Sequence, residues 1–143
     1  MEFVPVSPDA EMRELLKRCD LLVSDLDSSD SLFFYGCHSN GNITGVVGLE
    51  IHGTVALIRS LAVTSNIRGL GVGRLLVQFA EEMARKKGIE SLFLLTTTAS
   101  NFFERLGYMH HQRDSAPESI KTTAQFSGLC PASSCFMSKQ LSS

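Results

Sequence analysis

The chain of 143 residues lacks the features that mark several classes of protein. No apolar run approaches the roughly 20 residues needed to cross a bilayer. Residues 1–5 show no basic segment followed by an apolar stretch, which argues against a secretory signal. No long polar tract is present, and the composition is 43% hydrophobic and 20% charged, which argues against disorder. We therefore expect one globular domain over residues 1–143, in the cytoplasm and not attached to a membrane.

The net charge is small, and the cysteines and histidines form no recognisable motif. The formal net charge of -2 provides no basic surface for nucleic acid or anionic lipid, so a polyanionic ligand must be bound locally. The four cysteines form no C-x-x-C pair, and the four histidines lack zinc-finger spacing. We therefore expect reduced thiols, no disulfide framework and no metal site.

Alternating and helical patterns predict the order of the elements. A first helix begins near Ser7, with proline at its first helical position. Strands over residues 32–37, 43–51 and 54–63 form an antiparallel meander, because Asn40-Gly41 and His52-Gly53 are turn signals between them. A wholly apolar strand at 92–95, a helix at 100–106 and a strand around 134–138 complete the order.

A long amphipathic helix begins near Val72. Apolar residues at positions 72, 76, 79 and 83 form one stripe. Glu81 is expected on the solvent-exposed face, where it pairs with Arg85 one turn later. Gly88 ends the helix.

The segment that opens this helix carries the strongest signal. It reads Arg68-Gly69-Leu70-Gly71-Val72-Gly73-Arg74 and directly follows a strand and a short turn. Glycines let a diphosphate approach the unpaired amides of a helix start, and Arg68 and Arg74 add positive charge. A nucleotide P-loop would need Lys followed by Ser or Thr, and a dinucleotide fingerprint would need G-x-G-x-x-G, so neither fits. A glycine-rich helix start without a ligand stays open as an alternative.

The pattern Arg68-x-x-Gly71-x-Gly73 resembles the coenzyme A loop of the GNAT superfamily of N-acetyltransferases. Leu61-Ala62-Val63 resembles the strand whose backbone, in that superfamily, bonds the pantetheine arm and polarises the thioester. Residues 101–108, Asn-Phe-Phe-Glu-Arg-Leu-Gly-Tyr, resemble its second signature helix. The two signatures occur in the right order and cover about residues 30 to 110.

This resemblance implies an α/β fold whose mixed, mostly antiparallel sheet has six or seven strands and about four flanking helices. The fourth and fifth strands are expected to splay apart beyond a bulge. Acetyl-coenzyme A is the implied cosubstrate, and Val63 the backbone contact to the thioester and its oxyanion. The residues implied in coenzyme binding are Leu61, Ala62, Val63, Arg68, Gly69, Leu70, Gly71, Val72, Gly73, Arg74, Asn101 and Phe103.

A closer resemblance is to amino-acid N-acetyltransferases of the acetylglutamate-synthase type and to small arsenic-resistance-associated N-acetyltransferases. It is carried by residues 92–98, 102–108, 116–120 and Ser138-Lys139. Phe103 stands where many superfamily members have a tyrosine that protonates the thiolate, and Leu57 where some have a glutamate base. Members of that subgroup often have phenylalanine at the position of Phe103. The resemblance therefore assigns neither a general acid nor a general base.

Candidate acceptor contacts come from individual residues. Arg59 alternates with Leu57, Leu61 and Val63, which predicts one shared face of the sheet. Arg59 could bind the carboxylate of an amino-acid-like acceptor, or it could be a surface arginine. Glu50 is a weak candidate for a base acting through water, and a solvated strand end is the other interpretation.

The C-terminal third supplies further candidates. Thr97 and Lys121 are candidate acceptor contacts, and a short helix from Pro117 is expected to cover the acceptor pocket. We expect His110 and His111 on the surface.

The predicted function is direct transfer of acetyl to the primary amine of a small, amino-acid-like molecule in a ternary complex. One alternative is acetylation of a protein lysine or N-terminus. Another is a non-catalytic coenzyme A-binding regulatory module, since the tyrosine and glutamate are missing. The sequence leaves open whether the protein is a monomer or a homodimer.

Overall fold

The computed structural model describes residues 2–19, 21, 31–64, 71–123, 126 and 134–141. Within these ranges, seven strands form one sheet in the order β1-β2-β3-β4-β5-β7-β6. In chain order the elements are β1 (Val4–Val6), α1 (Ala10–Arg18), β2 (Leu32–Ser39), β3 (Asn42–His52), β4 (Val55–Val63), α2 (Val72–Lys86), β5 (Ser91–Thr96), α3 (Ser100–Arg105), β6 (Met109–His110), a 3-10 helix (Arg113–Ser115), α4 (Glu118–Lys121) and β7 (Cys135–Gln140). The α/β fold with a mixed, mostly antiparallel sheet is therefore confirmed.

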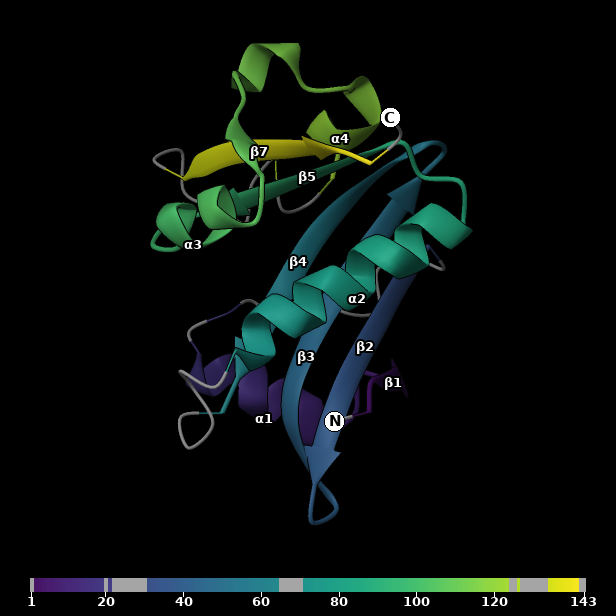
Figure 1. Cartoon of the computed structure of the whole chain (residues 1–143), viewed down its shortest axis with the longest axis vertical. Coiled ribbons are helices and arrows are strands. Elements are labelled where there is room, and N and C mark those ends of the chain that lie inside the picture. Colours follow the sequence, from purple (N-terminus) through teal and green to yellow (C-terminus); the bar gives the residue numbers. More distant parts are fainter. Residues whose placement is uncertain are drawn as a thin grey trace.

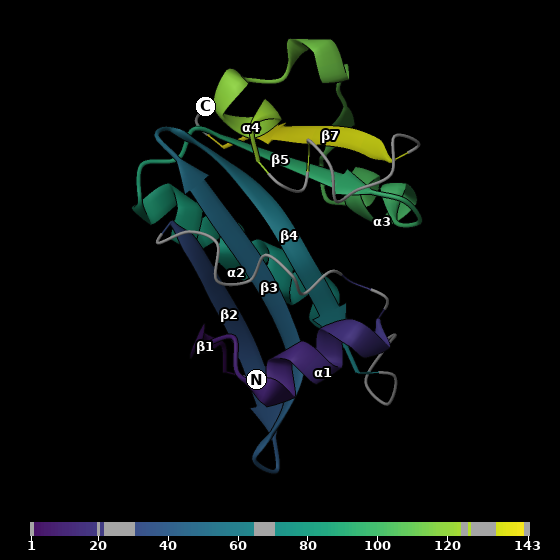
Figure 2. The same cartoon turned by 180° about the vertical axis from the view of Figure 1, so that it is seen from behind.

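The helices lie on both faces of the sheet. Figure 1 shows α2 in front of β2, β3 and β4, and the reverse view shows α1 on the other side (Figure 2). The main core lies between the sheet and α2, a smaller cluster lies under α1, and a third lies under α4. None of the helices in the described ranges is long and apolar enough to span a membrane.

Local signals explain the N-terminal half. Asn40 and Gly41 adopt φ values of 52° and 82°, so this two-residue turn joins β2 to β3 as predicted. Helix α1 begins two residues later than predicted, because Asp9 caps it and Ser7 does not. The side chain of Asp9 accepts a hydrogen bond from the Met12 amide at 2.9 Å. The sequence predicts neither β1 nor β6, since strands of two or three residues carry no visible alternation.

The strands β4 and β5 are paired over only part of their length. Their parallel pairing runs from Val55 opposite Ser91 to Ile58 opposite Leu94, although β4 continues to Val63. Strand β5 stays paired with β7 up to Thr96. The ribbons of β4 and β5 diverge beyond this point (Figure 1). The expected splaying of the fourth and fifth strands is therefore present.

Candidate active site

A β-bulge marks the place where β4 leaves β5. Residues 46 to 48 of β3 lie opposite residues 59 to 62 of β4, so β4 carries one extra residue. Within this stretch Ser60 has a φ of 57°, in the left-handed region that residues other than glycine rarely adopt. A bulge bends its strand and disrupts local pairing. The bulge thus accounts for the divergence of β4 from β5.

The bulge also changes which side chains share a face. Alternation predicts that Leu57, Arg59, Leu61 and Val63 point the same way. Instead, Leu57 packs in the cluster under α4, whereas Leu61 and Val63 pack against the core on the α2 side. This prediction is wrong because the extra residue shifts the alternation of β4 by one position.

Beyond the bulge, peptide groups of β4 point toward the side from which β5 has parted. The amide of Thr64 donates to a carbonyl of β3 at 2.9 Å. Since successive residues of a strand direct their peptide groups to opposite edges, Val63 and Leu61 direct theirs away from β3. Ala62 directs its peptide groups toward β3. The Val63 carbonyl accepts a hydrogen bond from Cys19 Sγ at 3.8 Å. An extended chain of amides could approach Leu61 and the Val63 amide along this edge as an added strand would.

The first turn of α2 begins at a glycine with a special conformation. Gly71 is the N-cap, with φ 80° and ψ 11°, and within the described part of the chain no side chain caps the helix. The first amides of a helix have no intrahelical partner, and the helix dipole makes this end positive. A Cβ at Gly71 would lie 3.7 Å from Nη2 of Arg74, which is exposed. The Arg74 guanidinium therefore lies beside the first amides of this helix.

The structure also shows what surrounds Val72 and Gly73 in this turn. Val72 is buried in the core, so only its backbone can face a ligand. Gly73 lies against α3, because a Cβ there would be 3.5 Å from Cζ of Phe102. The predicted contacts Arg68, Gly69 and Leu70 lie outside the described residues.

Helix α3 exposes Asn101 and buries Phe103. The Phe103 ring packs edge to face against Phe102 and Tyr108, at centroid distances of 5.0 and 5.5 Å. Tyr108 is not placed to protonate a thiolate, since its hydroxyl donates to Glu81 inside the core at 2.9 Å. Burial, with the nearby Glu81 charge and hydrogen bond, raises the pKa of Tyr108. Tyr108 therefore does not replace the tyrosine missing at position 103.

Arg59 and Glu50 form a buried ion pair. Nη1 of Arg59 lies 3.3 Å from Oε1 of Glu50, and their side chains are 1% and 8% exposed. The other oxygen of Glu50 lies 2.7 Å from Nε2 of His52, and Nε of Arg59 donates to Ser60 Oγ at 3.1 Å. Gly48 makes room for the arginine, because a Cβ there would lie 3.1 Å from Cγ of Arg59. The interpretations of Arg59 as a surface residue and of Glu50 as a solvated strand end are therefore wrong.

The other predicted acceptor contacts are more peripheral. Thr97 is exposed just beyond β5. Lys121 is half-buried on α4 and lies 3.7 Å from the carboxylate of Glu118. Leu57 is 1% exposed, so the position where related enzymes have a base is part of the apolar core.

The two histidines differ in environment. His110 is exposed and lies 2.7 Å from Glu104, as predicted for a surface residue. The His111 ring is half-buried between Phe93 and Phe136, at centroid distances of 5.5 and 5.4 Å. The prediction of surface placement is therefore wrong for His111, because two aromatic rings from β5 and β7 cover it.

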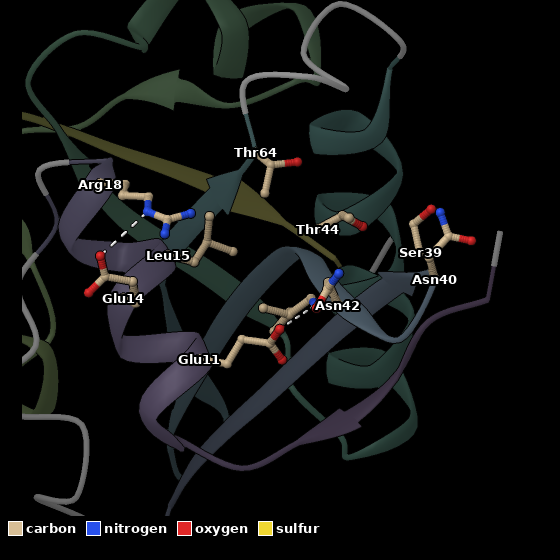
Figure 3. Close-up of a pocket in the computed structure, with 10 residues that line it drawn as sticks. Glu11, Glu14, Leu15, Arg18, Ser39, Asn40, Asn42, Thr44 and Thr64 are labelled. Carbon is tan, nitrogen blue, oxygen red and sulfur yellow. Dashed lines mark hydrogen bonds and ion pairs between the residues drawn. The ribbon is translucent and has the colours of Figure 1, made fainter.

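A pocket of about 440 Å³ lies where α1 crosses the hairpin of β2 and β3 (Figure 3). Figure 3 shows Arg18 paired with Glu14 at 3.5 Å and Glu11 accepting from a hairpin amide at 3.2 Å. The lining residues are Glu11, Glu14, Leu15, Arg18, Ser39, Asn40, Asn42, Ile43, Thr44 and Thr64. No sequence motif predicts this pocket, because three separate segments form it. Among the described residues, no three of His, Cys, Asp and Glu come together as a metal site requires.

The buried position of Glu81 on α2 also differs from the prediction. Its side chain is buried and lies 3.1 to 3.2 Å from the Lys139 ammonium in addition to bonding Tyr108. The predicted solvent-exposed position is therefore wrong. Glu81 follows the buried Val77 by four residues and precedes the buried Ala84 by three, and this spacing is the available signal.

Comparisons with known proteins identify the family. The acetyltransferase (GNAT) family matches residues 2–108. An uncharacterized N-acetyltransferase of Chlorobaculum tepidum is 37% identical over 89 residues, which cover 61% of this chain and 56% of that protein. An amino-acid acetyltransferase of Ralstonia nicotianae is 36% identical over 58 residues, which cover 41% of this chain and 13% of that protein. The chain thus spans about half the length of the first relative and a small part of the second.

A solved structure has the same fold. N-acetylglutamate synthase of Neisseria gonorrhoeae, in complex with coenzyme A and N-acetyl-glutamate, is similar with a TM-score of 0.79. The sequence identity is 18%, and the match covers 100% of this chain and 36% of the other. The fold with its parted β4 and β5 agrees with the family match over most of the sequence. The chain therefore belongs to the acetyltransferase (GNAT) family.

Proposed function

We propose that the protein transfers the acetyl group of acetyl-coenzyme A to the primary amine of a small, amino-acid-like molecule. Membership of the family supports the use of acetyl-coenzyme A. Similar proteins named amino-acid acetyltransferase and N-acetylglutamate synthase support an amino-acid-like acceptor. The observation that carries the proposal is the parting of β4 from β5 beyond Ile58 and Leu94, beside the uncapped glycine start of α2.

Two places on the chain are proposed to bind the coenzyme. Amides of the first turn of α2, with Arg74 beside them, would bind the diphosphate. Backbone groups of Leu61 and Val63 would pair with the pantetheine arm, and the Val63 amide would stabilise the oxyanion of the reacting thioester. When bound, the cosubstrate supplies an activated acetyl group. Asn101, at the exposed start of α3, is proposed to contact the coenzyme, and Phe103 to support that contact from the core.

The acceptor is proposed to bind on the face that carries the buried ion pair. Arg59 directly precedes the bulge residue Ser60, near the point where the thioester would lie. An acceptor carboxylate would be a further negative partner for this guanidinium, beside Glu50. Glu50 is the proposed base, acting through water, and Thr97 and Lys121 are proposed outer contacts.

Release of thiol from acetyl-coenzyme A tests the function. The assay compares free amino acids with the amines that lack only their carboxylate, and with peptides that carry a lysine or a free N-terminus. We expect the free amino acids to give the fastest release. Faster release with peptides would contradict the small-molecule acceptor and favour a protein acetyltransferase. Binding of coenzyme A in calorimetry, with no release for any amine, would favour the non-catalytic module.

A further inference from the structure

Glu81 connects three elements that are far apart in the sequence. It lies on α2, and its carboxylate accepts hydrogen bonds from Tyr108, 27 residues later, and from Lys139 on β7, 58 residues later. The Lys139 ammonium also donates to the Leu106 carbonyl at 2.8 Å, at the C-cap of α3. These bonds tie the C-terminal end of α3 to the third turn of α2.

A chain of aromatic contacts returns from this point to the start of α2. The Tyr108 ring contacts Phe103 at 5.5 Å, and Phe103 contacts Phe102 at 5.0 Å. Phe102 lies against Gly73 in the first turn of α2. The contacts therefore form a closed circuit from Glu81 through α3 to Gly73, and this circuit sets the spacing between α3 and the glycine start of α2.

We propose that Glu81 is a positioning residue for the coenzyme site, which acts by holding α3 against the first turn of α2. This inference rests on the proposed function, because it takes that turn as the coenzyme A site. Glu81 acts through Tyr108 and Lys139 and does not touch the coenzyme. Its side chain is 6% exposed, and its carboxylate is engaged by Tyr108 and Lys139 on the side away from the first turn of α2.

Replacement of Glu81 by Gln tests the inference in the full chain. The amide keeps the shape but loses the charge that holds Lys139. We expect the Kd of coenzyme A in calorimetry and the KM of acetyl-coenzyme A to rise on the order of tenfold, because small displacements of binding groups are costly. The KM of the amine should stay unchanged. A purely structural role would lower thermal stability and the amount of active enzyme without moving either constant.

Glu82→Gln is the matched control. Glu82 is the exposed neighbour on the same helix, so this variant removes the same charge without breaking the circuit. Loss of a negative charge should by itself favour an anionic coenzyme, so a weaker affinity in E81Q would run against simple electrostatics. Equal Kd values for E81Q and E82Q would overturn the inference.

Failure of E81Q to fold and failure of the unmodified protein to bind coenzyme A are distinguishable outcomes. If E81Q does not fold, Lys139→Met keeps the stem of the lysine and removes its bonds to Glu81 and Leu106. A raised coenzyme Kd in K139M would then support the inference, and an unchanged Kd would overturn it. Absence of coenzyme A binding by the unmodified protein would refute the proposed function itself, which separates that failure from a failure of the Glu81 inference.

Discussion

Replacement of Gly71 by Ala should weaken coenzyme A binding beyond its effect on folding. Gly71 has a φ of 80°, where a Cβ costs about 1–2 kcal/mol. For a domain of this size, that cost lowers Tm by roughly 3–8 °C. The new methyl would also lie 3.7 Å from Arg74 Nη2, in the space that a phosphate would occupy. Loss of one hydrogen bond to a charged group costs about 1.5–3 kcal/mol, so Kd should rise roughly 10- to 150-fold.

Gly88→Ala provides the matched control for this experiment. Gly88 has a φ of 81°, follows the other end of α2, and has open space where a Cβ would be placed. Both variants should therefore lose similar stability in thermal unfolding, but only G71A should lose affinity for coenzyme A in calorimetry. Equal affinities in the two variants would refute the placement of the diphosphate at the start of α2.

Three further predictions concern the buried polar residues and the sheet. Gly48→Ala should lower the free energy of unfolding in urea by about 1–3 kcal/mol, because its Cβ would lie 2.9 Å from Cε1 of Phe34 and 3.1 Å from both Cγ and the backbone oxygen of Arg59. An unchanged value would contradict tight packing at this position. Glu50→Gln should lower the free energy of unfolding by about 3–5 kcal/mol, because it removes a carboxylate that pairs with Arg59 in the core. Glu14→Gln, in an exposed pair with Arg18, should lower it by less than about 1 kcal/mol. Similar losses in the two variants would contradict a buried ion pair between Glu50 and Arg59. The pKa of Tyr108 is raised above its unfolded value of 10.0, so the protonated tyrosine stabilises the fold below pH 10 and this contribution is lost as pH rises further. Unfolding measured from pH 8 to 11 should therefore show a shallower alkaline decline in Tyr108→Phe, and parallel curves would exclude this role.

Much of the fold could be predicted because its signals are local. The turn at Asn40-Gly41 needs two positive φ values, and the structure has both. Glycines at 88 and 107 follow α2 and α3 with φ values of 81° and 97°, as C-terminal signals should. In each case a few adjacent residues determine the conformation, so no knowledge of distant partners is needed.

The bulge in β4 could not be predicted from the residues that form it. Position 60 is a serine and not a glycine or asparagine, the residues that commonly adopt a positive φ. Its conformation follows from the register of β3 against β4, which is a property of two strands and not of one. Because this extra residue is not predicted, the predicted sheet faces of Leu61 and Val63 are the reverse of the observed ones. The parting of the strands itself was accessible only through the family resemblance.

The pairing of the buried charges Glu50, Arg59 and Glu81 bears on the proposed chemistry. The sequence predicts Glu81 on the surface and leaves a surface position open for Glu50 and Arg59, because charged residues are seldom buried unless they are paired, and their partners come from other elements. In the structure these charges lie in pairs, which reduces the field that any one of them projects into the coenzyme site. Phe103 and Leu57 are apolar and buried. Within the described residues, backbone groups at the bulge and at Gly71, together with the exposed Arg74, are therefore the polar groups proposed to face the thioester carrier. Changes in backbone geometry at these points should therefore reduce turnover, as should loss of the proposed base Glu50, whereas loss of the exposed Glu82 carboxylate should not.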